Sequence, residues 1–377
     1  MPDTADDGQR VRELLCVGSG MAPRYRANTL QALALPKGAR IQFRYSQGII
    51  PEALRNALSG NSLVGAAVLL GHVDATPLPR DADGPCFVVP YRAATLIAAR
   101  RVGSFFTLQL ELGPRRIAKD IDAFQELLPN TSPHWSKTAS PKRPVGYWCQ
   151  EATNIIAATQ KAAGVEGWQA LVNQLKDQPD FKKQSYFYVI DGLYEIKASK
   201  NTGEADGYAA QELVNGQFTL RARQTYELRV VHFDPQADDH WADKKPRVLK
   251  IEAPTALVVP RTSSELVVDS PYDAKTYTFS IADTPADQYA SLLLKPQPPE
   301  KSSNEEDDIP ELYFPLFLKA DLVSNLGRAF LLGSLLGLGQ MVPMFLKGTT
   351  DAVTTVVTFT FSYLTGIFFI AGLKKPL

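Results

Sequence analysis

The sequence predicts an α+β protein with a mostly β soluble region, followed by a C-terminal two-helix transmembrane hairpin. Two long apolar segments near the C-terminus predict the hairpin. Short runs rich in β-branched and aromatic residues, separated by turn residues, predict the sheets. The expected parts are a mixed α/β domain over 1–145, a β-sandwich-like domain over 146–295, a linker and interfacial segment over 296–325, and the hairpin over 326–377.

The first domain is basic and rich in arginine. Residues 1–145 carry 18 Lys and Arg against 12 Asp and Glu, and 14 of the 18 are Arg, in a chain of zero formal net charge. Guanidinium groups match phosphate and carboxylate geometry, and neighbouring aromatic rings can stack on bases. This pattern favours an anionic, nucleotide-like or oligonucleotide ligand; the alternative is an ordinary sheet with aromatic residues inside and arginine outside. The candidate ligand-binding residues, which should converge in space, are Arg24, Arg26, Arg44, Arg92, Arg100 and Arg101.

The second domain is expected to begin with a helical region over 150–176 and to continue as an antiparallel sandwich, because strand-like runs follow at short intervals. Residues 295–309 are proline-rich and then acidic, which predicts a flexible linker. After it, aromatic residues stand close to Lys319, and we expect them to be interfacial anchors at a membrane. These aromatic residues are Tyr313, Phe314 and Phe317.

The two apolar segments span 329–346 and 352–373. At about 1.5 Å per residue, each helix could cross a hydrocarbon core of roughly 30 Å. Four basic residues flank the pair, whereas only Lys347 lies between them, so the positive-inside rule predicts a multi-pass protein with both termini cytoplasmic. The flanking residues are Lys319, Arg328, Lys374 and Lys375.

Polar side chains recur every three or four residues in the second apolar segment and would share one helical face. Two interpretations remain open: the lining of a pore formed by a homo-oligomer of three or more copies, or packing between helices. The pore-lining candidates, with an acidic mouth and an aromatic gate, are Asp351, Thr354, Thr358, Ser362, Thr365 and Phe369. The helix-packing candidates of the first segment are Gly333, Gly337 and Gln340.

No catalytic motif is present in the sequence: it has no GxxxxGK[ST] loop, GxSxG elbow or CxxC pair. We therefore predict no enzymatic activity and no cofactor. The acidic and histidine residues between His232 and His240 fit no known ligand spacing, so no metal site is predicted there. Three sparse cysteines do not form a disulfide framework and indicate a reducing compartment.

In domain layout, arginine-rich start and apolar hairpin over 329–373, the chain resembles the two-helix membrane effectors of bacterial antiviral defence. The resemblance implies that a cytosolic domain senses a nucleotide-like signal and that the hairpin disrupts or conducts across the membrane. The expected function is an oligomeric membrane effector or ligand-gated channel. The alternatives are a membrane-anchored adaptor that binds a protein partner through its β-rich domains and, third, an enzyme held at the membrane.

Overall fold

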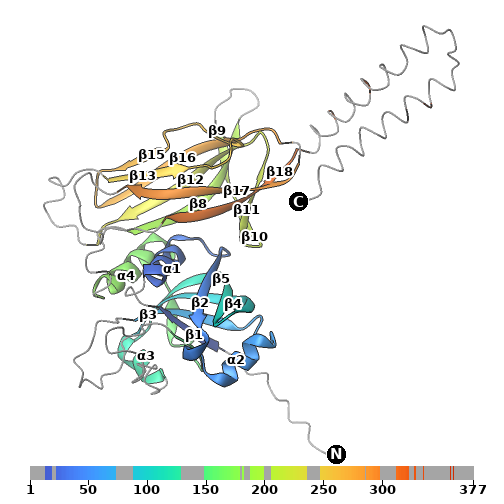
Figure 1. Ribbon diagram of the computed structural model, residues 1–377. Coiled ribbons are helices and arrows are strands. Elements are labelled where there is room, and N and C mark those ends of the chain that lie inside the picture. Colours follow the sequence, from blue (N-terminus) through green and yellow to red (C-terminus); the bar gives the residue numbers. More distant parts are fainter. Residues whose placement is uncertain are drawn as a thin grey trace, which may run out of the picture.

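The computed structural model is predominantly β: among the residues it describes, strands account for 55% and there are four α-helices. Figure 1 shows two stacked parts, a sheet surrounded by helices and a pair of facing sheets. The residues described are 13–18, 23–73, 88–128, 148–178, 181, 187–198, 205–235, 247–284, 286–297 and 311–321, with the isolated positions 327, 334, 357 and 360.

The first domain contains a seven-stranded sheet of order β2-β5-β4-β3-β1-β6, with β7 paired to β5. Strands β1 and β3 are parallel, and the other pairs are antiparallel. The turn between β4 and β5 is the tight hairpin expected from the sequence, with Gly103 at φ 60°. The strands are β1 (Glu13–Gly18), β2 (Arg40–Ser46), β3 (Ala67–Val73), β4 (Val88–Val102), β5 (Phe105–Ala118), β6 (Trp148–Ala152) and β7 (Thr159–Lys161).

Helices cover this sheet. Figure 1 shows α1 and α4 between the sheet and the second domain. The helices are α1 (Pro23–Ala34), α2 (Glu52–Ser59), α3 (Ile121–Leu127) and α4 (Gly164–Lys176), with a short 3-10 turn η1 (Gln47–Ile49).

Cys16 of β1 and Cys149 of β6 are buried free thiols with their Sγ atoms 3.4 Å apart.

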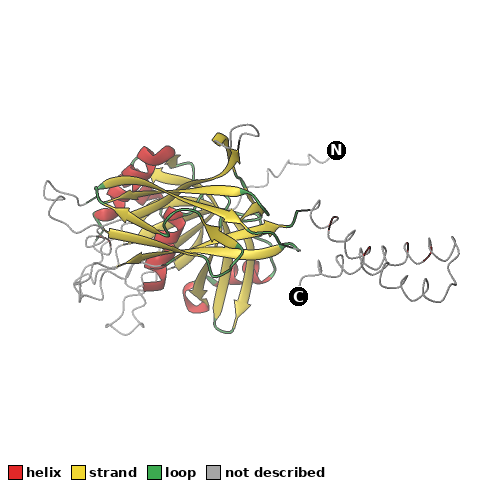
Figure 2. Ribbon diagram, turned by 90° about the horizontal axis from the view of Figure 1, so that it is seen from above, coloured by secondary structure: helices red, strands yellow, loops and turns green. Residues whose placement is uncertain are grey.

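The second domain is a two-layer sandwich, seen from above in Figure 2. Its larger sheet has the order β10-β11-β18-β17-β13-β15 and the smaller one β14-β16-β12-β8-β9. The larger sheet comprises β10 (Leu213–Val214), β11 (Gln217–Arg221), β13 (Arg247–Glu252), β15 (Glu265–Val268), β17 (Gln288–Gln297) and β18 (Leu312–Lys319). The smaller one comprises β8 (Phe187–Ala198), β9 (Ala205–Ala210), β12 (Thr225–Phe233), β14 (Val258–Pro260) and β16 (Tyr272–Ile281).

Residues Leu312–Lys319, expected in the linker and interfacial segment over 296–325, form strand β18. It lies between β11, to which it is parallel, and β17, to which it is antiparallel. Its apolar residues alternate, as in a strand with one face in a core. Phe314, predicted to be a membrane anchor, is 1% exposed and stacks on Phe218 with ring centroids 4.9 Å apart. The buried side chains of β18 are Leu312, Phe314, Leu316 and Leu318.

The two domains share one hydrophobic core cluster. Trp168 of α4 meets Phe233 of β12 edge-on, with ring centroids 6.0 Å apart. The Arg40 guanidinium of β2 donates to the Asn215 side chain (3.5 Å), in the Asn-Gly turn that joins β10 to β11. Both turn residues have positive φ, which suits a two-residue hairpin.

Two arginines hold the C-terminal end of α1: Arg92, which is buried, and Arg115, which is half-buried. Arg92 donates to the Ala32 carbonyl (3.2 Å), and Arg115, its partner across β4 and β5, donates to the Leu33 and Leu35 carbonyls (3.1 and 3.5 Å). The last carbonyls of a helix have no partner within the helix, and cations there also favour the helix dipole. Burial lowers the pKa of Arg115 to about 10, so its guanidinium stays protonated at neutral pH.

The fold class predicted from the sequence is wrong. The structure is mostly β, and among the residues it describes no helix is long and apolar enough to span a membrane. Apart from isolated positions, the predicted hairpin over 326–377 lies outside the described residues. The helix predicted over 150–176 begins only at Gly164, because β6 and β7 occupy 148–152 and 159–161 as sheet strands.

We predict that Arg115→Met lowers the free energy of unfolding by about 2–3 kcal/mol, because two buried carbonyls lose their donor. Urea denaturation of the full chain measures this change. Arg101→Met is the matched control: its exposed guanidinium bonds only to the nearby Gly103 carbonyl, so its effect should stay within about 0.5 kcal/mol. Equal losses in both variants would contradict the capping role.

Candidate functional site

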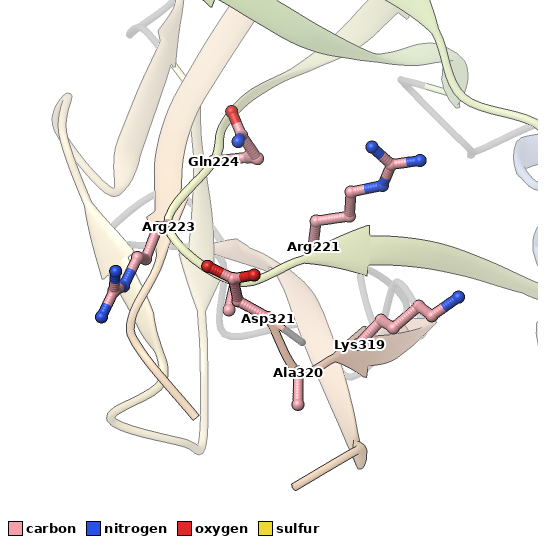
Figure 3. Close-up of a pocket in the computed structure, with 7 residues that line it drawn as sticks. Arg221, Arg223, Gln224, Lys319, Ala320 and Asp321 are labelled. Carbon is pink, nitrogen blue, oxygen red and sulfur yellow. The ribbon is translucent and has the colours of Figure 1, made fainter. Parts of the chain in front are cut away.

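The candidate site lies at the end of the sandwich where β11 and β18 both stop. A pocket of about 430 Å³ is hollowed there, beside the point at which the chain continues toward the apolar segments (Figure 3). We call its lining residues the rim: Arg221, Ala222, Arg223, Gln224, Lys319, Ala320 and Asp321.

Backbone hydrogen bonds fix the rim turn between the two sheets. The Ala222 N–H donates to the Lys319 carbonyl (3.0 Å), and the Arg223 N–H donates to the Ile281 carbonyl (2.8 Å). Arg223 has φ 65°, a conformation that is uncommon for a residue with a side chain. The turn is therefore hydrogen-bonded to both sheets of the sandwich and holds Arg223 in a strained backbone conformation. Such strained residues cluster at functional sites.

Tyr226 supports the rim from inside the sandwich. Its buried hydroxyl accepts a hydrogen bond from the Arg221 N–H (2.7 Å). This hydrogen bond to the backbone N–H of a residue five positions earlier is similar to the tyrosine corner of β-sandwich domains. Burial raises the pKa of Tyr226 to about 12, so the hydroxyl stays protonated and the rim turn stays attached over the whole physiological pH range.

The rim carries an excess of positive charge. Arg223 pairs with Asp283 (2.8 Å), and this hydrogen bond raises the pKa of Arg223. Arg221 and Lys319 are register partners on adjacent parallel strands, are both exposed, and extend to the same side, away from Arg223 (Figure 3). Neither forms an ion pair with any described residue. Like charges on neighbouring strands repel, so an anion bound between them would relieve this repulsion.

The structure does not bring the six predicted ligand-binding arginines together. Arg92 is 1% exposed and caps α1. Arg26 lies on α1, which packs on the buried face of β2 through the Tyr25–Tyr45 ring contact. Arg101 points to the opposite face of β4 from its neighbour Arg100, because successive strand residues alternate. Arg24 lies on α1, but its side chain is outside the described residues.

Only Arg44 and Arg100 share an exposed face. Both are register partners of Thr107 on the strand between them, and the Arg44 guanidinium lies 3.8 Å from the centre of the Phe105 ring. This pair is a small cationic and aromatic area on the outer side of the first sheet. It is what remains of the predicted six-residue site.

The other candidate residues cannot be placed. Of the acidic and histidine residues from His232 to His240, for which no metal site was predicted, His232 and Asp234 are buried at the end of β12, and the others lie outside the described residues. Among the residues the structure describes, no group of His, Cys, Asp and Glu could hold a metal ion. The pore-lining candidates Asp351, Thr354, Thr358, Ser362, Thr365 and Phe369 and the packing candidates Gly333, Gly337 and Gln340 also lie outside the described residues.

The sequence reasoning missed the rim. Lys319 was noted as a charge flanking the apolar segments and as the neighbour of the expected interfacial aromatic residues, and Arg221 was not singled out. The alternation of apolar residues over 312–318 was the available signal, because it indicates a strand that ends at Lys319. Its pairing with β11, whose register partners lie 98 residues earlier, could not be read from the sequence.

Comparisons of the chain with protein-family models, curated proteins and solved structures give no match. The function is therefore argued from the geometry of the rim and its place in the chain.

We predict that Tyr226→Phe lowers the free energy of unfolding by about 1 kcal/mol, because the Arg221 N–H loses its acceptor. The variant should also change the response to base. The folded pKa of about 12 lies above the usual value of about 10. Between these pH values the unfolded chain releases a proton that the folded chain retains, so stability falls as pH rises.

Denaturation curves from pH 9 upward measure this effect. We expect the stability of Tyr226→Phe to fall less steeply than that of the wild type, since phenylalanine does not ionise. Tyr272→Phe, which changes a half-exposed tyrosine on β16 (48% exposed), should follow the wild-type slope. Parallel curves for Tyr226→Phe and the wild type would show that Tyr226 does not carry the shift.

Proposed function

We propose that this protein is a membrane-associated binding protein whose rim binds a phosphate-type anionic group. The observation that carries the proposal is the position of the cationic rim in the chain. Asp321, the last rim residue, precedes the apolar segment 329–346 by eight residues. A fully extended chain spans at most about 3.3–3.6 Å per residue, so the rim stays within about 30 Å of the start of that segment.

The chemistry of the rim suits an anion. Arg221 offers a planar fork of donors and Lys319 a compact positive charge, and both groups suit phosphate oxygens. Asp321 lies between them and Arg223 (Figure 3), which keeps the net charge of the rim moderate. Such a site binds a phosphate group electrostatically and reversibly, whether the group belongs to a lipid or to a small molecule.

A second candidate function rests on the Arg44–Arg100 face of the first sheet. Arginine beside an aromatic ring on an exposed sheet face suits a nucleotide-like ligand. Arg44 already covers the Phe105 ring, which leaves less ring surface for a base. The rim, which is hollowed and has two cations without an ion pair among the described residues, is therefore the preferred site.

Thermal unfolding of the full chain in lipid nanodiscs tests the proposal. Because a ligand that binds the folded state raises the melting temperature, discs that contain phosphatidylglycerol should stabilise the protein relative to phosphatidylcholine discs. The double variant Arg221→Gln/Lys319→Gln should lose this gain. Inorganic pyrophosphate added to phosphatidylcholine discs tests the other source: a gain there, lost in the same variant, would identify a soluble phosphate ligand.

Arg44→Gln/Arg100→Gln is the matched control, since it removes two exposed arginines from the other domain. It should keep the response to anionic lipid. A response that survives in the rim variant and disappears in this control would reject the rim and favour the second candidate. No response of the wild type to either probe would reject phosphate binding altogether.

A further inference from the structure

The outward face of the larger sandwich sheet carries exposed aromatic residues beside the rim. Tyr289 of β17 is 70% exposed, and its ring centroid lies 5.3 Å from that of Phe317, its register partner on β18. Tyr313, on the same face of β18, is 55% exposed. Rings left in water at this level of exposure mark a surface that another apolar phase can cover.

Two positive charges continue this face to its end. Lys319 follows Phe317 by two residues on β18 and therefore points to the same side. Arg221 is the register partner of Lys319 on the neighbouring strand. Aromatic rings next to Lys and Arg are typical of protein surfaces at the membrane–water boundary, where the rings enter the headgroup layer and the cations meet phosphates.

We propose that this face docks on the surface of a bilayer that contains anionic lipid, with Tyr289 and Phe317 in the headgroup layer and Arg221 and Lys319 on lipid phosphates. This inference rests on the proposed function and names its ligand as a lipid headgroup. The short connection from Asp321 to the apolar segment 329–346 keeps the face near any bilayer that the segment enters.

The other half of the same face does not offer this chemistry. There Glu252 accepts from both Lys250 (3.1 Å) and Lys295 (2.8 Å), and Lys295 also pairs with Glu311 (3.5 Å). Its charges are balanced within the sheet. On the rim side, by contrast, Arg221 and Lys319 form no ion pair with a described residue, and these two cations complement anionic lipid, which favours a membrane over a second copy of the chain.

The test places an environment-sensitive nitrobenzoxadiazole label on the face. In a Cys86→Ser background, where Cys16 and Cys149 are buried, Tyr289→Cys is labelled in the full chain and incorporated into phosphatidylcholine–phosphatidylglycerol nanodiscs. We expect a blue shift and strong quenching by lipids with a nitroxide headgroup. The control label at Tyr208→Cys, on an exposed residue of the opposite sheet (53% exposed), should remain in water and unquenched.

The label replaces one of the docking rings, so a second label at Ser291→Cys, the next outward position of β17, should give the same result with Tyr289 intact. Adding Arg221→Gln/Lys319→Gln should reduce the quenching at both positions. A blue shift without quenching would indicate a protein partner or a second copy and would overturn the proposal. An unquenched label would also overturn the proposal, even if the same discs still stabilise the protein through Arg221 and Lys319. That combination would support the phosphate site of the proposed function and reject only the docking of this face on the membrane.

Discussion

The insertion of β18 between β11 and β17 is the constraint on which the candidate site depends. Four alternating apolar side chains of β18 are buried in the sandwich, and its backbone is bonded on both sides. This placement sets Lys319 beside Arg221 and Phe317 beside Tyr289. Because β18 is also the last strand that the structure describes, the rim is the described part of the sandwich that lies nearest in sequence to the apolar segments. The same strand thus contributes side chains to the sandwich core, supplies Lys319 to the pocket, and ends shortly before the apolar C-terminal segments.

The two capping arginines show why arginine content alone did not locate a ligand site. Arg92 and Arg115 serve the helix end of α1, which lies against the second domain, and their charges face carbonyls rather than a ligand. A buried guanidinium and an exposed one look the same in a sequence. Which of them meets solvent depends on strand register, and bulges in β4 shift that register between Arg92 and Ala94.

Local patterns predicted much of the strand content and little of the site. Alternation and turn residues located the Gly103 hairpin and most strands, since these features depend on near neighbours. The helix α1 was missed, and the helix predicted from residue 150 gave way to β6 and β7, whose sheet partners lie far away in sequence. The sequence analysis expected all three aromatic residues between 313 and 317 to lie at a membrane boundary. Pairing in the sheet divides them: Phe314 faces the core, whereas Tyr313 and Phe317 face outward.

The central claim is that the rim lies in the headgroup layer of a membrane. Paramagnetic relaxation of lipid phosphorus nuclei, caused by a nitroxide attached at Ala320 of the full chain in nanodiscs, measures this most directly. The account predicts strong relaxation from Ala320 and little from a nitroxide at Gly103, the hairpin tip of the first domain. Equal relaxation from both positions, or stronger relaxation from Gly103, would contradict it.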